Sequence, residues 1–119
     1  MASTELHEDA GDLKPETIDH HRAVVSLMEE LEAVDWYDQR VDATGNDELR
    51  AILAHNRDEE MEHAAMVLEW LRRNNPVIDQ QLREYLFKDG PIIDPDHAET
   101  PAAAPAGDGS LGIGSLKED

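Results

Sequence analysis

The chain has 119 residues and carries 28 acidic against 10 basic side chains, a formal net charge of −18 at pH 7. So negative a protein is repelled by nucleic acid and by anionic membranes, and it attracts cations. It contains no cysteine, which excludes disulfides, thiolate zinc sites and cysteine-bound iron–sulfur clusters. The acidic, polar N-terminal residues predict that there is no signal peptide, and no apolar run is long enough to span a membrane.

The first long helix is predicted to begin at Pro15, after a flexible arm that covers residues 1–14. Proline suits the first helical position because the amide hydrogen that it lacks has no partner there. Glu16 and Asp19 complement the positive end of the helix dipole, and the pattern continues to about Val41. Apolar residues recur with the helical period along one stripe and its flank: Val24, Val25, Leu27, Met28, Leu31, Val34, Trp36 and Val41.

Residues 42–46 predict a turn, in which Gly45 is suited to a left-handed conformation and Asn46 to capping the next helix. The second helix should run from Asp47 to about Arg73. Two long helices joined by so short a turn must fold back on each other as an antiparallel hairpin. Such a hairpin alone leaves half of its apolar surface in contact with water.

Pro76 is predicted to open a short third helix that passes through Leu86, with Gly90 as its stop. Residues 15–90 therefore make up the folded domain. Residues 91–109 are predicted to be a disordered linker because they are rich in alanine, proline and glycine. The last segment, residues 110–119, contains a short apolar patch, which either has no role or is a docking peptide.

Within the second helix, Glu60 and His63 lie three residues apart and therefore face the same way. They belong to a stripe with the helical period, where a charge is costly unless it is paired or binds a metal. The stripe consists of Leu49, Ile52, Leu53, Asn56, Glu60, His63, Val67 and Trp70. Pairs at this spacing are commonly solvated neighbours on a helix surface, but their place on an apolar stripe favours a metal site.

The spacing matches half of a known arrangement. In ferritin-like dinuclear carboxylate bundles, two helices each give a Glu-x-x-His pair and two others each give one glutamate. This chain offers the pair once, so two hairpins related by a two-fold axis would supply the full set. The His-Glu-x-x-His motif of zinc proteases is absent. Three other histidines lack an acidic partner at ligand spacing on this stripe and are interpreted as surface or interface residues: His20, His21 and His55.

Four stretches of the two helices resemble the encapsulated ferritins, and they occur in the same order. They are residues 28–37 (MEELEAVDWY), 54–60 (AHNRDEE), 62–66 (EHAAM) and 68–73 (LEWLRR). The resemblance covers about residues 15 to 90. It implies an all-α fold, in which an antiparallel two-helix hairpin with a short C-terminal helix dimerises into a ferritin-like four-helix bundle. It further implies that the homodimers assemble into a ring-like decamer.

The same resemblance implies a ferroxidase that oxidises Fe(II) to Fe(III) with dioxygen at a dinuclear site, with two irons per dimer. It assigns three ligands, with Tyr37 close by and Trp36 near the approach to the site: Glu30, Glu60 and His63. Two further acids would form an outer site that attracts iron and other divalent cations: Glu29 and Glu32. Oxygen and nitrogen donors suit Fe(II), Mn(II) and Zn(II), so the residues themselves leave the metal open.

The C-terminal segment resembles an encapsulin cargo-loading peptide. In this interpretation three apolar side chains dock on the encapsulin shell protein: Leu111, Ile113 and Leu116. The protein would then work in the lumen of an encapsulin nanocompartment within the cytoplasm, where the shell stores the iron. Two alternatives remain open: a non-enzymatic acidic cargo or assembly protein, and a dinuclear manganese or zinc protein of other chemistry.

Overall fold

The computed structural model describes residues 5–94, which form three α-helices, one short 3-10 helix and no strand. The α-helices are α1 (Pro15–Ala43), α2 (Asp47–Asn74) and α3 (Pro76–Tyr85). The all-α prediction, with a long hairpin and a short third helix, is confirmed for this part of the chain. Residues 5–86 belong to one compact unit, and Phe87 begins a second. No helix of the described residues is both long and apolar enough to cross a membrane.

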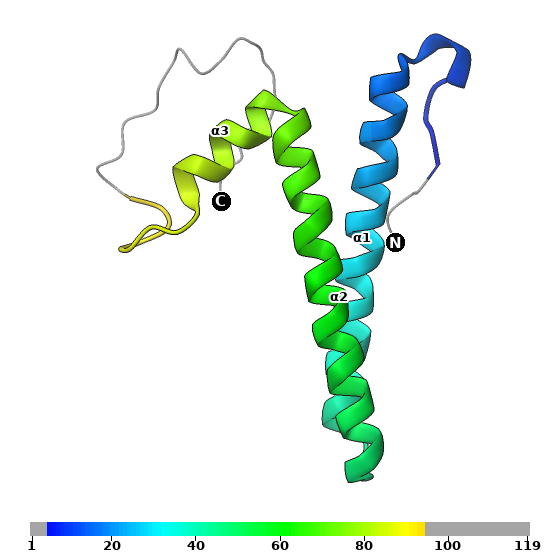
Figure 1. Cartoon of the computed structure of the whole chain (residues 1–119), viewed down its shortest axis with the longest axis vertical. Coiled ribbons are helices and arrows are strands. Elements are labelled where there is room, and N and C mark those ends of the chain that lie inside the picture. Colours follow the sequence, from blue (N-terminus) through cyan, green and yellow to red (C-terminus); the bar gives the residue numbers. More distant parts are fainter. Residues whose placement is uncertain (1–4, 95–119) are drawn as a thin grey trace. The chain divides into compact units, whose positions relative to one another are not determined.

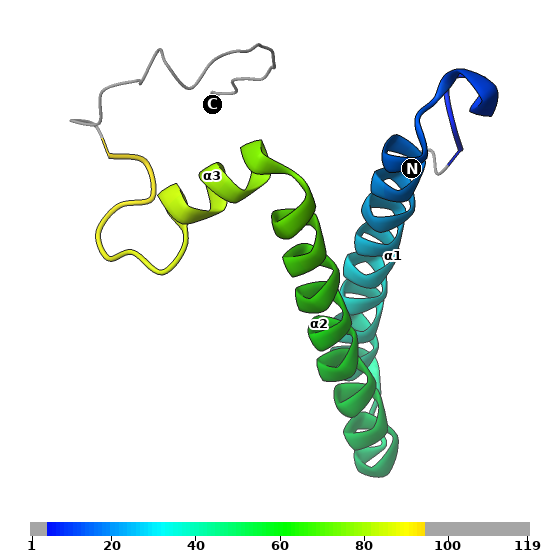
Figure 2. The ribbon, with the colours of Figure 1, turned by 45° about the horizontal axis from the view of Figure 1, so that its top comes forward.

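Helices α1 and α2 run antiparallel and lie side by side near the turn that joins them. Figure 1 and Figure 2 both show them diverging toward the other end of the hairpin, where α2 leads into α3. Pro15 occupies the start of α1, as predicted, and Glu16 lies in its first turn. The predicted arm contains a 3-10 helix, Ala10–Asp12, which the lack of an apolar period did not indicate.

The turn between the long helices is held by polar side chains. The Asn46 side chain accepts a hydrogen bond of 2.9 Å from the Leu49 amide, so the predicted cap is confirmed. Arg50 donates to the backbone carbonyls of Val41 and Thr44 and thereby ties α2 to the end of α1. Gly45 does not adopt a positive φ, so its predicted left-handed conformation is wrong. Extended residues on both sides of Gly45, at the end of α1 and the start of α2, make the reversal without it.

The hairpin has a thin core. Among the described residues only Ala64 and Leu71 are buried, at 7% and 3% exposure, and both follow His63 on α2. Many large apolar side chains of the two long helices are exposed: Leu31, Trp36, Leu49, Ile52, Met61, Met66 and Trp70. The part of the predicted α2 stripe that contains Ile52 and Trp70 therefore does not pack fully against α1. A single hairpin leaves an apolar surface uncovered, as the sequence indicated.

Where α1 and α2 diverge, the structure contains an open groove of about 510 Å³. Residues of both long helices line the groove, and those of α2 are apolar. The lining residues are Asp19, Arg22, Ala23 and Ser26 of α1 and Met66, Val67 and Trp70 of α2. Ser26 is one helical turn before Glu30, and Val67 is one turn after His63. The groove therefore continues along the face that carries these two candidate ligands.

Helix α3 begins with a strong cap and ends early. The Asn75 side chain accepts hydrogen bonds of 3.0 Å from the amides of Val77 and Ile78. The helix ends at Tyr85, and Leu86 caps it, so the predicted stop at Gly90 is wrong. The chain leaves the helix through Phe87, whose φ of 59° is left-handed, before Gly90 takes a φ of 91°. A left-handed residue ends a helix by itself, and here it is a phenylalanine, which sequence rules do not lead one to expect.

The second unit is described only from Phe87 to Asp94 and has no helix there. Phe87, Ile92 and Ile93 are strongly exposed within it. Most of the predicted linker and the predicted docking residues, Leu111, Ile113 and Leu116, lie outside the described residues.

Candidate metal centre

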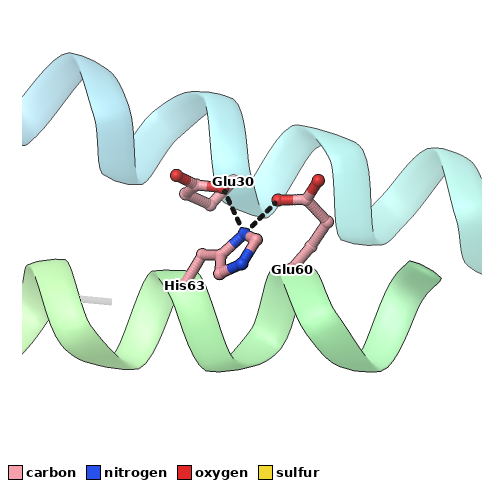
Figure 3. Close-up of side chains that lie close together, drawn as sticks. All are labelled: Glu30, Glu60 and His63. Atoms are coloured by element: carbon pink, nitrogen blue, oxygen red, sulfur yellow. Dashed lines mark hydrogen bonds and ion pairs between the residues drawn. The ribbon is translucent and has the colours of Figure 1, made fainter. Parts of the chain in front are cut away.

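Three of the predicted ligands meet between the long helices. Figure 3 shows Glu30 of α1 pointing toward Glu60 and His63 of α2. The Nδ1 atom of His63 lies 3.3 Å from Oε1 of Glu60 and 3.7 Å from Oε1 of Glu30. One ligand atom from each of the three residues lies within 4.8 Å of the other two. Within residues 5–94, no other group of three or more histidine, aspartate or glutamate side chains lies so close together.

Helix geometry explains why the side chains converge. Glu60 and His63 stand one turn apart on α2, and Glu30 faces them because α1 and α2 run antiparallel. The side chains of Glu30 and Glu60 are 24% and 26% exposed, whereas that of His63 is 43% exposed. The cluster is thus half-covered by its own hairpin and open on one side.

The two carboxylates of the cluster shift each other's pKa. The hydrogen bond with Glu60 is the main cause that raises the pKa of Glu30, and burial and the Glu60 charge raise it further. The same hydrogen bond lowers the pKa of Glu60, and His63 also lowers it. The two pKa values shift in opposite directions because the carboxylates lie close enough to interact directly. A cation is favoured between two such carboxylates, because it relieves their repulsion.

The cluster fits a divalent metal ion. Donors that share one ion lie at most about 4.4 Å apart, because metal–oxygen and metal–nitrogen bonds are about 2.0–2.2 Å long. The limit of 4.8 Å within which the three donors fall is close to this value, so small side-chain rotations suffice. Two oxygens and one imidazole nitrogen suit iron, manganese and zinc, and three donors leave coordination positions open. A complete dinuclear set needs more ligands than this one chain brings together.

Comparison with known proteins shows the family of this chain. The model of the EncFtn-like family matches residues 5–89, which include all three helices and the whole cluster. The chain belongs to the EncFtn-like family. It is 59% identical to an encapsulated ferritin-like protein of Rhodospirillum rubrum, over 98% of this chain and 91% of that protein. It is 52% identical to a ferritin-like protein of Thermotoga maritima, over 94% of this chain and 97% of that one.

A solved structure and a shorter match extend the comparison. The crystal structure of a Nitrosomonas europaea protein superimposes on this EncFtn-like chain with a TM-score of 0.72 at 58% identity. It covers 75% of this chain and 98% of the other. An encapsulin nanocompartment cargo protein of Myxococcus xanthus is 42% identical over 52 residues, which are 44% of this chain and 40% of that protein.

The other residues that the sequence singled out do not join the cluster in this EncFtn-like chain. Glu29 and Glu32 are exposed on α1, on either side of Glu30. Trp36 is exposed further along α1. Tyr37 is half-buried, and the guanidinium of Arg40 lies 5.5 Å from the centre of its ring. The outer site and the role of Tyr37 therefore stay predictions.

Two polar contacts between distant segments escaped the sequence analysis. Arg57 of α2 forms an ion pair of 3.0 Å with Asp38 of α1. The amide nitrogen of Asn75 lies 3.1 Å from Nε2 of His20, so this histidine connects the start of α1 to the cap of α3. Neither pair has a recognisable spacing in the sequence, because the alignment of two helices decides which of their residues meet. The exposed His55 lies 3.7 Å from Glu59 on its own helix.

Proposed function

We propose that this protein is a ferroxidase, which oxidises Fe(II) to Fe(III) with dioxygen at a dinuclear site formed across a homodimer interface. One observation carries the proposal: Glu30, Glu60 and His63 converge as half of a ferritin-like ligand set. Family membership supports it, since the relatives of Rhodospirillum rubrum and Thermotoga maritima are named as ferritin-like proteins.

A second hairpin would complete the site. Related by a two-fold axis, two copies would contribute two Glu-x-x-His pairs and two single glutamates. An apolar surface for such pairing is available, because Ile52, Met66 and Trp70 are exposed on α2, the helix that carries Glu60 and His63. Covering them would stabilise the dimer by the hydrophobic effect, at about 25 cal/mol for each Å² of apolar surface removed from water.

The residues of the cluster have distinct roles in this reaction. Fe(II) is the substrate, each ion gives one electron to dioxygen, and the product is Fe(III). Glu30 and Glu60 favour this change because two anionic oxygens stabilise a threefold positive charge more than a twofold one. Both carboxylates bind the cation in their deprotonated form. His63 presents Nδ1 to the same two carboxylates, and three donors would leave coordination positions of a bound ion for dioxygen.

The proposal is tested by adding Fe(II) in air and following oxygen uptake together with the absorbance of ferric iron. Alanine at Glu30, Glu60 or His63 should slow the oxidation at least about tenfold, because even residues that only support a metal ligand cost tenfold or more when removed. Glu62→Ala is the matched control, since Glu62 is exposed on the same helix and lies outside the cluster.

The outcomes separate the alternatives. Wild-type protein that takes up no more oxygen than Fe(II) in buffer would contradict a ferroxidase and leave a non-enzymatic acidic cargo protein. Stable binding of Mn(II) or Zn(II) without iron-dependent oxygen uptake would indicate a metal site of other chemistry. An unchanged rate in His63→Ala would show that the site has been misplaced.

The proposal extends to an encapsulin compartment. A relative of Rhodospirillum rubrum is named as encapsulated and one of Myxococcus xanthus as an encapsulin cargo protein. We propose the same setting here: ring-like decamers in the lumen of a nanocompartment within the cytoplasm, where the shell stores the ferric product. Many copies of the C-terminal segment on one ring would strengthen weak individual contacts with the shell.

Removal of residues 110–119 tests the docking role of this segment. The shortened protein should no longer co-purify with a co-expressed encapsulin shell, because Leu111, Ile113 and Leu116 are lost, but it should keep its oxidase activity. Lys117→Ala is a control that leaves these three apolar side chains in place. Equal loading of the shortened and the full chain would contradict docking through this segment.

A further inference from the structure

The half of the hairpin that lies between the turn and the metal cluster has almost no buried packing. Helices are usually held in alignment by interlocking buried side chains. Here no described residue of α1 is buried, and none of α2 is buried from Asp47 to His63. The two buried residues, Ala64 and Leu71, lie on the other side of the cluster. Core packing on the turn side is limited to half-buried side chains such as Val34, Val41 and Leu53, so polar contacts can contribute to the alignment of α1 and α2 there.

The charge of this region works against alignment. Nine acids stand on the two helices around the cluster: Glu29, Glu30, Glu32, Asp35, Asp38, Asp58, Glu59, Glu60 and Glu62. Their repulsion pushes the metal-free helices apart or along each other. A slip by one turn moves a residue by about 5.4 Å, which would take Glu30 out of reach of Glu60 and His63.

Arg57 places a positive charge where it opposes this slip. Its Nη1 atom lies 3.0 Å from Oδ1 of Asp38 on α1, and its Nε atom lies 3.2 Å from Oδ1 of the adjacent Asp58. The arginine side chain is only 25% exposed. A guanidinium held from two directions is a rigid link, because its donors form a fixed planar fork. Arg57 stands one turn from Glu60, and the Arg50 contacts tie the helices nearer the turn.

We propose that Arg57 and Asp38 are positioning residues, which set the alignment of α1 and α2 and so hold Glu30 opposite Glu60 and His63 before metal binds. The proposal rests on the metal site described above but not on iron oxidation. It assigns the ion pair a specific task, which is to prepare the ligand geometry in a chain whose acids oppose it.

The direction in which the metal affinity changes when Arg57 is replaced distinguishes a positioning role from simple electrostatics. A positive charge one turn from the ligands repels metal ions, so its removal alone should tighten metal binding. Loss of a positioning contact should weaken binding, because the ligands must first be brought together. Arg57→Asp makes the contrast larger, since it adds negative charge and destroys the ion pair. The reversed pair, Asp38→Arg with Arg57→Asp, keeps the net charge and restores an attraction between the same positions.

Titration of the full chain with Mn(II) measures the metal affinity, and electron paramagnetic resonance measures the concentration of free Mn(II). Arg57→Gln and Arg57→Asp should bind Mn(II) about two- to fivefold more weakly than wild type, as expected for a partly exposed ion pair. The reversed pair should recover most of this loss. Arg73→Gln is the matched control, because it removes the same charge from α2 and its partner, Glu69, lies on the same helix. It should not weaken binding.

Each result decides one point. Tighter Mn(II) binding in Arg57→Asp would overturn the proposal. A reversed pair that binds Mn(II) as weakly as Arg57→Asp would also overturn it, whether or not circular dichroism shows full helix content. Recovery in the reversed pair supports it even if Arg57→Gln loses helix content. His63→Ala serves as the reference for the site itself: Mn(II) binding that survives this change would contradict the metal site and, with it, the positioning role that rests on it.

Discussion

The α1–α2 cluster and the α2–α3 junction both gather acidic side chains. Arginines neutralise these acids at the junction, whereas no arginine within residues 5–94 contacts Glu30 or Glu60 in the cluster. At the junction, Arg72 donates to both carboxylate oxygens of Glu69, at 2.8 and 2.7 Å, and to Asp79 of α3. Arg73 and Arg83 bind the same two acids from the outside. Hydrogen bonds from Arg72 and Arg73 lower the pKa of Glu69 from its ordinary value of 4.5 to about 2, and Arg72 and Arg83 lower that of Asp79.

The cluster has no such compensation from arginine. Glu30 and Glu60 face each other across the helices with one imidazole between them, and the pKa of Glu30 is raised rather than lowered. The same acidic chain thus builds one site whose charges are satisfied within the protein and one whose charges are not. The difference is consistent with the proposed roles: the junction holds α3 on α2, whereas the cluster would be completed by metal and by a second chain.

The largest expected effect concerns assembly. In the proposed dimer, Glu30 and Glu60 of both hairpins would lie in one seam, and the repulsion of four carboxylates would disfavour pairing. Divalent metal reverses this, so it should bind the dimer better than the single chain and shift the population toward dimers and rings. Linkage gives about 2.7 kcal/mol for each site when free metal is a hundred times its Kd. Light scattering should show a smaller mass with chelator than with added Fe(II) or Mn(II).

The double variant Glu60→Ala/His63→Ala is the reference for this measurement, because it removes both ligands of α2. It should gain no mass when metal is added. Full rings in the chelated wild-type protein would show that apolar contacts, such as those of Trp36 and Ile52, suffice for assembly. In that case the unbalanced charge of the cluster would serve the reaction alone.

The sequence predicted the helices well because their ends carry local signals. Pro15, Asn46 and Pro76 mark three helix starts, and each acts through its own backbone or its nearest amides. The end of α3 was not predictable in this way. It depends on Phe87 adopting a left-handed conformation, for which the residue type gives no indication.

The cluster was predictable for a similar reason, and the positioning pair was not. The spacing of Glu60 and His63 fixes their common direction on one helix. Glu30 was assigned through family resemblance, and the structure brings it to the other two. Arg57 and Asp38 are 19 residues apart, and their contact depends on how far α1 and α2 are displaced along each other. Helical periodicity contains no information about that displacement.

The smallest expected effect concerns the junction and its dependence on pH. The pKa of Glu69 is lowered from 4.5 to about 2 in the folded chain, and that of Asp79 is also lowered. Groups with lowered pKa values stabilise the fold above their unfolded pKa, and this contribution is lost as the pH falls through the folded values. The contacts that hold α3 on α2 should therefore be intact at pH 5 and weaken progressively toward pH 2, since in the unfolded chain Glu69 titrates near pH 4.5. Hydrogen exchange of the α3 amides should become faster over this range relative to those around Leu71.

Arg72→Met is the variant that shows whether the arginine causes this change. It keeps the length of the side chain near α3 and removes the cation that Glu69 and Asp79 share. The α3 amides should then exchange faster already at pH 5, and the further change down to pH 2 should be smaller than in wild type, while Mn(II) binding at the cluster stays the same. The two regions would thereby be separated, because acid and Arg72→Met act on the junction and ligand variants act on the cluster. An α3 that exchanges equally in wild type and Arg72→Met at pH 5 would show that the Asn75 cap and apolar contacts hold it without the ion pairs.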